Sequence, residues 1–200
     1  MVVIKVGGSL LDWPGLPARL AAEVAGREAV LLAGGGRFAD ALRDLDRVHG
    51  LGERRSHALA LRVLDLTAKI LADLVPGSEV VDDPDAISDA RRRGRVPVLA
   101  PRRFLDADDA RPDALPHAWT TTTDAIAARV AVRLGADELV LLKSAGLQDG
   151  VGLEDAARLG LVDPEFPRAA DGLPLIRLVN ARDPGGTPRT FAGRVRGPAS

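Results

Sequence analysis

The first residues able to do chemistry lie close to the amino terminus, in Lys5-Val6-Gly7-Gly8-Ser9. They stand where a short apolar run, Val2–Val6, gives way to glycine. Glycines at such a junction let backbone amides approach an anion closely, and a following helix N-terminus adds favourable partial charge. A lysine beside them could neutralise a phosphoryl group during its transfer. A tight turn with a lysine that reaches solvent is the alternative, and the motif alone does not separate the two.

A second glycine cluster, Gly34-Gly35-Gly36, follows the next apolar run, Ala29–Ala33. Each glycine costs about 0.5–1 kcal/mol relative to alanine in regular structure, so bare backbone must have a use there. A surface of amides for an anion or an acceptor molecule explains three glycines better than a turn does. The spacings G-x-G-x-x-G and G-x-x-x-x-G-K-[ST] are not met, which argues against a dinucleotide fold and a P-loop.

A run of threonines, Thr120–Thr123, precedes Asp124 and an alanine-rich helical pattern. Threonine and aspartate before a helix are typical of an N-cap. Capping needs only one such residue, so the others could offer hydroxyls and amides to a ligand. We therefore expect Thr123 to contact a substrate and the Asp124 carboxylate to orient a lysine or to accept a hydrogen bond from the acceptor.

A lysine ends another apolar run, in Leu141-Leu142-Lys143-Ser144-Ala145-Gly146. The chain has only three lysines, Lys5, Lys69 and Lys143, against 24 arginines. An ordinary charge at a strand end would explain Lys143, but its position matches that of Lys5, so we expect it beside a nucleotide together with Ser144 and Gly146. Lys69 lies four residues from Asp65 and from Asp73, which predicts a solvated helix pair instead.

The elements that must position these residues alternate along the chain. Helical patterns separate short apolar runs, and such alternation predicts an α/β fold with a mostly parallel sheet covered by helices. The predicted strands are Val2–Val6, Ala29–Ala33, Glu79–Val81, Val96–Ala100, Glu138–Leu142 and Leu175–Val179, and the predicted helices are Leu16–Val24, Phe38–Val48 and Glu53–Val75. We expect one domain over 1–200, an irregular loop over Pro101–Pro116 and a partly ordered tail over 180–200.

Composition narrows the class of protein. The formal net charge of −1 provides no field for nucleic acid, and 46% hydrophobic with 28% charged residues is typical of a soluble globular protein. The apolar start is interrupted at once by Lys5 and glycine, which predicts neither a signal peptide nor a membrane span. Zero cysteines agree with a reducing compartment. We therefore expect a cytoplasmic protein with no nucleic-acid or membrane partner.

In this order, the two glycine clusters, the segment Thr122-Thr123-Asp124-Ala125-x-Ala127-Ala128 and Leu141-Leu142-Lys143 resemble the amino acid kinase family over about residues 1–150. The resemblance implies a three-layer α/β/α sandwich that uses ATP with Mg²⁺ carried on its phosphates and no metal site of its own. It implies a homodimer as well. The implied site has catalytic Lys5 and Asp124, an ATP side of Lys5, Gly7, Gly8, Ser9, Lys143, Ser144 and Gly146, and an acceptor side that includes Gly34, Gly35 and Gly36.

One departure from the family is plain. Members of usual length carry a later Gly-Gly-Met-x-x-Lys element whose lysine touches the phosphates, and no lysine follows Lys143 here. Lys143 or a later arginine, such as Arg177 or Arg194, would have to substitute. The alternative is a nucleotide-binding subunit or sensor that keeps the fold without turnover.

The chain resembles one subgroup of the family in its short length. It also resembles that subgroup in three segments, Asp46-x-x-His49, Ser56-His57 and Pro116-His117-x-Trp119. That subgroup implies transfer of phosphate to an aminomethylfuran phosphate in methanofuran biosynthesis. His49, His57 and His117 are then candidates to contact a small phosphorylated acceptor, and we expect roughly one of the three to reach it, because a lone histidine is more often structural. Asp40 or Asp46 could meet an acceptor ammonium group, although a solvated helix face explains both.

Overall fold

One mostly parallel sheet organises the chain. A computed structural model describes residues 1–145, 151–183, 185 and 187–192, and seven strands of this part form a sheet in the order β3-β4-β2-β1-β5-β6-β7. All neighbouring strands run parallel except β6 and β7. The strands are β1 Val2–Val6, β2 Ala29–Ala33, β3 Ser78–Val81, β4 Val96–Leu99, β5 Glu138–Lys143, β6 Leu175–Asn180 and β7 Arg189–Ala192. Each strand predicted from the sequence is confirmed to within one residue at either end.

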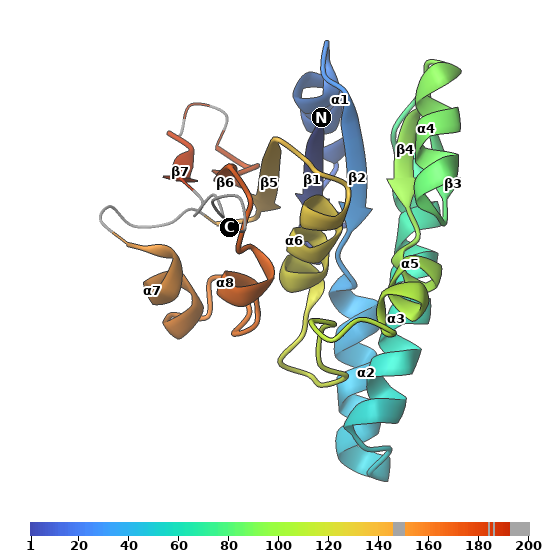
Figure 1. Cartoon of the computed structure of the whole chain (residues 1–200), viewed down its shortest axis with the longest axis vertical. Helices are drawn as coiled ribbons and strands as arrows, with labels where there is room; N and C mark the ends of the chain where they lie inside the picture. Colours follow the sequence, from blue (N-terminus) through green and yellow to red (C-terminus); the bar gives the residue numbers. More distant parts are fainter. Residues whose placement is uncertain (146–150, 184, 186, 193–200) are drawn as a thin grey trace, which may run out of the picture.

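Helices cover both faces of this sheet (Figure 1). They are α1 Leu16–Val24, α2 Gly36–His49, α3 Glu53–Leu74, α4 Pro84–Arg92, α5 Pro101–Asp108, α6 Thr123–Arg133, α7 Leu153–Arg158 and α8 Phe166–Ala169, and a 3-10 turn spans Gly8–Leu10. The antiparallel pair α2 and α3 extends beyond the carboxyl ends of β1 and β2, at the bottom of Figure 1. The three helices predicted from periodicity are confirmed.

Two apolar cores lie on the two faces of the sheet, because side chains alternate along each strand. On β1, Val3 belongs to the core shared with α6, whereas Ile4 belongs to the core shared with α1. Helix α3 contributes to both, with Leu61 on one side and Leu71 on the other. The predicted three-layer α/β/α sandwich is therefore confirmed.

The same alternation places two lysines on one face. Lys5 is the register partner of Leu141, and β1 and β5 run parallel. Since Lys143 comes two residues after Leu141, both lysines extend toward the layer of α6, which packs on β1 and β5 (Figure 1). Both also stand near the carboxyl ends of their strands, the edge where ligands of open α/β sheets bind.

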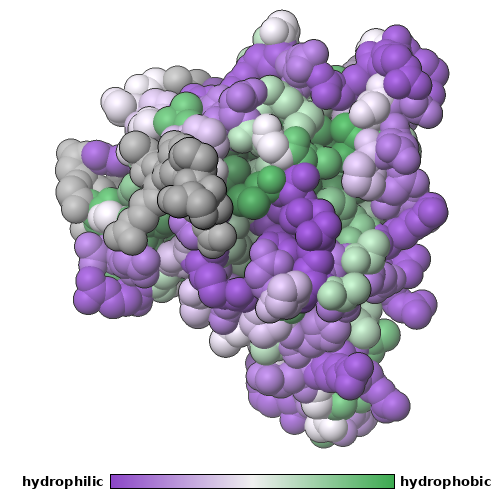
Figure 2. Space-filling model, in the orientation of Figure 1, coloured by the Kyte–Doolittle hydropathy of each residue, from purple (hydrophilic) through white to green (hydrophobic). Residues whose placement is uncertain are grey.

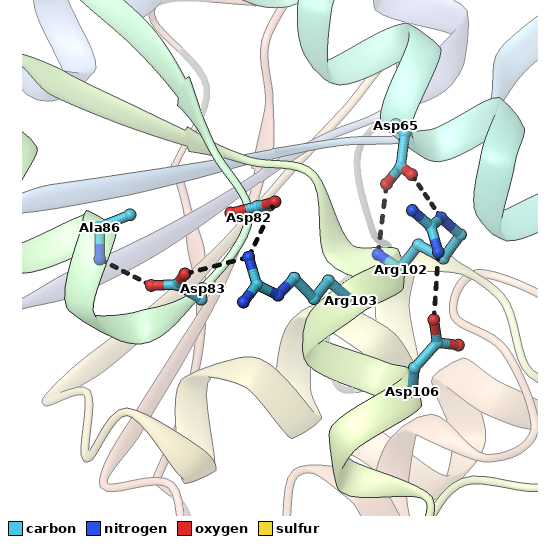
Figure 3. Close-up of polar contacts among 7 residues, drawn as sticks. All are labelled: Asp65, Asp82, Asp83, Ala86, Arg102, Arg103 and Asp106. Atoms are coloured by element: carbon cyan, nitrogen blue, oxygen red, sulfur yellow. Dashed lines mark hydrogen bonds and ion pairs between the residues drawn. The ribbon is translucent and has the colours of Figure 1, made fainter.

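The predicted loop over Pro101–Pro116 is wrong in its first half, where α5 forms. Proline is well tolerated in the first turn of a helix, so Pro101 starts the helix instead of breaking it. Phe104 and Leu105 are buried in the core. At the start of α5, Arg102 pairs with Asp65 of α3, as Figure 3 shows. Asp65 is thus engaged by an arginine, while Lys69 is exposed.

The predicted tail over 180–200 includes β7, which pairs antiparallel with β6, and residues 193–200, among them Arg194, lie outside the described residues.

On the face drawn in Figure 2, hydrophilic residues cover much of the outer helices and hydrophobic residues surface mainly between them. None of the helices in the described ranges is long and apolar enough to cross a membrane.

Candidate functional site

Asp124 lies between Lys5 and Lys143 at the carboxyl edge of the sheet. The Lys5 Nζ atom is 2.8 Å from Asp124 Oδ1, and the Lys143 ammonium donates a hydrogen bond to Asp124 Oδ2. The side chains of Lys5 and Asp124 are 7% and 5% exposed, whereas that of Lys143 is 22% exposed. Three charges of net +1 thus converge from β1, α6 and β5, which is a suitable arrangement for neutralising an anion.

Burial and mutual attraction set the charges of this trio. Burial alone would raise the pKa of Asp124, but the two adjacent ammonium groups outweigh it and hold the pKa of this carboxyl below its usual value. The pKa of Lys143 is lowered, first by burial and then by the charge of Lys5, while Asp124 opposes the shift. The carboxylate is therefore ionised near neutral pH, and Lys143 is the cation of the trio that loses its proton more readily than usual.

The two glycine clusters meet beside the trio. A Cβ atom on Gly8 would lie 2.1 Å from the Gly36 nitrogen, and one on Gly36, where φ is +52°, would lie 2.6 Å from the Gly8 carbonyl oxygen. The backbones of both loops thus touch, and Gly34 joins them through its amide, which donates to Val6 O at 2.8 Å. Side chains at these positions would hold the loops apart, so glycine serves close approach here.

The ATP side predicted from the sequence is largely gathered in one place. Gly7 donates from its amide to Leu142 O at 2.8 Å, and the hydroxyl of Ser9 donates to that of Ser144 at 3.0 Å. The first glycine loop and the end of β5 therefore lie against each other. Gly146 lies outside the described residues.

An arginine that the sequence reasoning missed reaches the same edge. Arg182 follows β6 and donates to the Ser9 carbonyl at 3.4 Å, and its side chain is exposed. Arg177, which the sequence offered as a substitute for the missing lysine, pairs instead with Glu138 at the start of β5 and with Glu23. Arg177 therefore pairs away from the trio, whereas Arg182 lies beside the first glycine loop at Ser9.

A pocket opens between the second glycine loop and the start of α6. It is lined by Gly35, Ala39, Arg43, His57, Ala60, Leu61, Leu64, Trp119, Thr121, Thr122, Thr123 and Ile126. The leucines, alanines and isoleucine give it an apolar floor, and polar groups gather at Arg43, His57 and the threonines. Since Thr123 is adjacent to Asp124 in the chain, the pocket neighbours the trio. The cavity is small, with a volume of about 40 Å³, and its lining offers a ligand both apolar and polar groups.

The three histidines lie in different environments. His57 and His117 stack with ring centroids 4.9 Å apart and an interplanar angle of 9°, and His117 Nε2 lies 2.9 Å from Asp109. Burial and the neighbouring His117 lower the pKa of His57, which keeps His57 neutral near pH 7. His49 is exposed at the last residue of α2, about 20 Å along the helix from Gly36, so the structure does not bring it to the pocket.

Trp119 and Arg43 form a wall of the pocket that the sequence reasoning did not assign. The Arg43 guanidinium lies 5.1 Å from the centre of the Trp119 ring, and the indole N–H donates to Asp46 Oδ2 at 2.7 Å. Asp46 also accepts from the Gly52 amide, so it holds the pocket wall and the start of α3. Asp40 pairs with Arg43. Both carboxylates thus engage other residues of the chain, Asp46 through Trp119 and Asp40 through Arg43.

No group of three or more histidine, cysteine, aspartate or glutamate side chains within the described ranges could hold a metal ion. The residues present suit the phosphates of a nucleotide that carries a divalent cation, because two ammonium groups and two touching glycine loops lie at the same edge of the sheet.

The fold and the site together define the class of protein: a mostly parallel α/β/α sandwich with two touching glycine loops and a lysine–aspartate–lysine trio at the carboxyl edge of the sheet. Residues 1–162 match the amino acid kinase family, and the chain belongs to that family. It is 25% identical over 190 residues to the [5-(aminomethyl)furan-3-yl]methyl phosphate kinase of Methanocaldococcus jannaschii, covering 92% of this chain and 76% of that relative. The family expected from the sequence is confirmed.

Solved structures share the fold. The UMP kinase of Bacillus anthracis superposes with a TM-score of 0.64 at 16% identity, over 92% of this chain and 88% of that one. The uridylate kinase of Archaeoglobus fulgidus gives a TM-score of 0.53 at 22% identity, and there the match covers 75% of this chain and only 64% of the other.

Proposed function

We propose that this protein transfers the γ-phosphate of Mg-ATP to a small phosphomonoester held in the pocket beside Gly35, His57 and Trp119. The observation that carries the proposal is the Asp124 carboxylate placed between the Lys5 and Lys143 ammonium groups, beside two touching glycine loops. Phosphoryl transfer asks little covalent chemistry of a protein and much positioning and charge neutralisation, which this site can supply.

In the proposed reaction an oxygen of the acceptor phosphate attacks the γ-phosphorus of ATP. A new P–O bond forms as the bond between the γ-phosphorus and the β,γ-bridging oxygen breaks, and ADP leaves with that electron pair. Mg²⁺ bound to the phosphates neutralises charge. Lys5 and Lys143 balance the negative charge on the transferring group, Asp124 holds both ammonium groups in place, and Gly7, Gly8 and Ser9 cradle the phosphates of ATP. Arg182 adds a cation near Ser9. Since no lysine follows Lys143 in the sequence, this arginine would supply the charge of the family's later lysine.

For the acceptor we infer a compact molecule with an apolar ring and a phosphate. The apolar floor formed by Leu61, Leu64 and Ile126 suits the ring, while Arg43, His57 and the amides of the second glycine loop suit the phosphate. The relative in Methanocaldococcus jannaschii is named for an aminomethylfuran phosphate, which has this character. That compound is our first choice of acceptor, with activity in the synthesis of a methanofuran-type cofactor.

The test is ADP release from Mg-ATP with a panel of phosphomonoesters that includes [5-(aminomethyl)furan-3-yl]methyl phosphate and UMP. Phosphorus NMR of the product should show the acceptor monoester signal replaced by a coupled pair from a diphosphate. The Lys5→Ala protein serves as the inactive comparison. ATP binding without ADP release on any acceptor would contradict the proposal and support the second candidate, a nucleotide-binding subunit or sensor, which the lack of any lysine after Lys143 favours.

A further inference from the structure

Asp163 is a buried carboxylate that holds the start of α6 from a distant part of the chain. It lies between α7 and α8 and is 6% exposed. Its Oδ2 atom accepts three hydrogen bonds, from the Thr122 amide at 3.1 Å, the Thr122 hydroxyl at 2.8 Å and the Ala125 amide at 2.9 Å. Thr122 is the N-cap residue of α6 yet makes no capping bond to the helix with its own side chain. Asp163 therefore supplies the cap.

The three hydrogen bonds bracket Asp124. Thr122 and Ala125 stand on either side of the pair Thr123–Asp124, so one carboxylate oxygen fixes the first turn of α6 around Asp124. The position of the Asp124 side chain between Lys5 and Lys143 depends on that turn, because a buried side chain has few rotamers and cannot compensate for a shifted backbone.

Asp163 also adds charge to the site. With Lys5, Lys143 and Asp124 it makes a group of two cations and two anions. Burial raises the pKa of Asp163, although the hydrogen bonds from Ala125 and Thr122 oppose the shift, and its negative charge acts to raise the pKa of Lys143.

Capping α6 with the buried Asp163 carboxylate has a cost in folding free energy. Its Oδ1 atom is buried and has no hydrogen-bond partner among the described residues, and an unsatisfied buried acceptor destabilises the folded state. A serine or threonine would cap the helix without this orphan oxygen or a buried charge.

We propose that Asp163 is a positioning residue of the phosphoryl-transfer site, which fixes Asp124 between Lys5 and Lys143. This inference rests on the proposed function for its kinetic consequence. Its structural half, the coupling of Asp163 to Lys143 through the position of Asp124, can be measured without turnover.

The kinetic test compares Asp163→Ala and Asp163→Asn with a matched control. Asp83 caps α4 by accepting from the Ala86 amide at 2.8 Å (Figure 3), and it follows β3, which β4 and β2 separate from β1 in the sheet, so Asp83→Ala removes a cap of the same kind away from the site. We expect Asp163→Ala to lower kcat at least tenfold with the KM for ATP within threefold. Asp163→Asn keeps an oxygen for the three donors and should recover part of the loss. Asp83→Ala should lower the Tm and leave kcat unchanged.

Two kinetic results would overturn the inference. One is a kcat for Asp163→Ala within twofold of the wild type in a folded protein. The other is an equal loss of kcat in Asp83→Ala at a matched decrease in Tm, which would reduce the effect to stability.

The test without turnover follows the titration of single lysines, which is practicable because the chain has only three. Reductive methylation with ¹³C-formaldehyde labels the amines of Lys5, Lys69 and Lys143 together with the N-terminus, and the pH titration of each signal is followed by NMR. In Asp163→Ala, which removes the hydrogen bonds that fix Asp124 beside Lys143, the Lys143 signal should titrate at lower pH than in the wild type, while the exposed Lys69 serves as an internal reference. An unchanged Lys143 titration would overturn the coupling even if the protein proves to have no kinase activity. A shifted titration in a protein without kinase activity would support the coupling and contradict only the proposed function.

Discussion

Gly8 and Gly36 touch backbone to backbone, although 27 residues separate them in the sequence. A Cβ atom on Gly8 would lie 2.1 Å from the Gly36 nitrogen, a distance at which something must shift, and both neighbours are backbone. Any side chain there would push the two glycine loops apart. The contact therefore ties the proposed ATP side of the site to the proposed acceptor side.

We predict that Gly8→Ala lowers stability by about 1–3 kcal/mol, the usual cost of forcing extra volume into a packed site, and removes most kinase activity. The matched control is Gly152→Ala, because a Cβ atom at Gly152 would meet nothing nearer than an Asp155 oxygen at 3.7 Å. Urea unfolding and ADP release measure the two effects. Wild-type activity in Gly8→Ala would show that the loops need no close contact.

A second prediction concerns Lys5. We expect Lys5→Ala to lower kcat/KM about 10²- to 10³-fold, the loss typical of removing one preorganised donor at a developing negative charge. Lys69→Ala is the control, since Lys69 is an exposed lysine on α3. Initial rates of ADP release give the comparison, and near-normal activity in Lys5→Ala would remove this lysine from the phosphoryl site.

The order of strands and helices, and the site residues that stand at strand ends, could be predicted because short stretches of sequence determine them. Lys5, the glycine clusters and Lys143 each stand at the end of an apolar run, and strand alternation then decides that both lysines share a face. Periodicity was enough for α1, α2 and α3. It missed α5, because Pro101 was interpreted as part of a loop, whereas proline in a first helical turn is compatible with a helix.

The rest of the site depends on tertiary contacts between residues far apart in the chain. Asp163 lies 38 residues from the Ala125 amide that it binds, and nothing in its neighbourhood marks it as a cap. Arg182 likewise reaches Ser9 only because β6 runs beside β5. The histidine motifs were visible in the sequence, but only the length and direction of α2 show that His49 lies away from the pocket.

The third prediction is a pH dependence set by Lys143. Its pKa lies below the usual 10.5, through burial and the charge of Lys5. Since the ammonium form is the one that neutralises phosphate, kcat should fall as the pH rises through this lowered pKa, earlier than for an ordinary lysine. Asp124 acts to raise the pKa of Lys143, so the alkaline limb of the kcat profile should move to still lower pH in Asp124→Asn.

Lys143→Arg provides the control for that profile, because a guanidinium keeps its charge above pH 12. Whatever activity this variant retains should lack the alkaline limb assigned to Lys143. A limb at the same pH in Lys143→Arg would assign it to another group. Folding stability should respond to pH in the opposite direction from kcat. Because the pKa of Lys143 is lower in the folded protein than in the unfolded chain, the protonated lysine destabilises the folded state. This destabilisation is complete below the folded pKa and diminishes as the pH rises toward 10.5.

Arg129 carries the fourth prediction, on stability. Its buried guanidinium forms two hydrogen bonds with Asp108 and two with Asp113, which fastens the segment before the pocket to α6. Breaking a buried ion pair from one side costs about 3–5 kcal/mol. Arg111 and Arg133 still approach Asp108, so we expect Arg129→Ala to cost about 3 kcal/mol, at the low end of that range.

Urea unfolding measures this loss, with Arg47→Ala as the control. Arg47 forms a single exposed pair with Asp44 on α2, and such pairs contribute about 0–1 kcal/mol. Equal unfolding midpoints for the two variants would mean that the network around Arg129 adds no stability beyond a surface pair.

The last prediction separates the histidines. His57 lines the pocket, where burial lowers its pKa and leaves the ring neutral, and we expect this ring to pack against the bound acceptor. His57→Ala should raise the KM for the phosphomonoester about tenfold, equivalent to ~1.4 kcal/mol, and leave the KM for ATP unchanged. His49→Ala should change neither constant, because His49 lies at the far end of α2. Steady-state kinetics with each substrate varied in turn provides the measurement. An increase in the KM for ATP in His57→Ala, or an acceptor effect in His49→Ala, would show that the acceptor binds elsewhere than in the pocket beside Trp119.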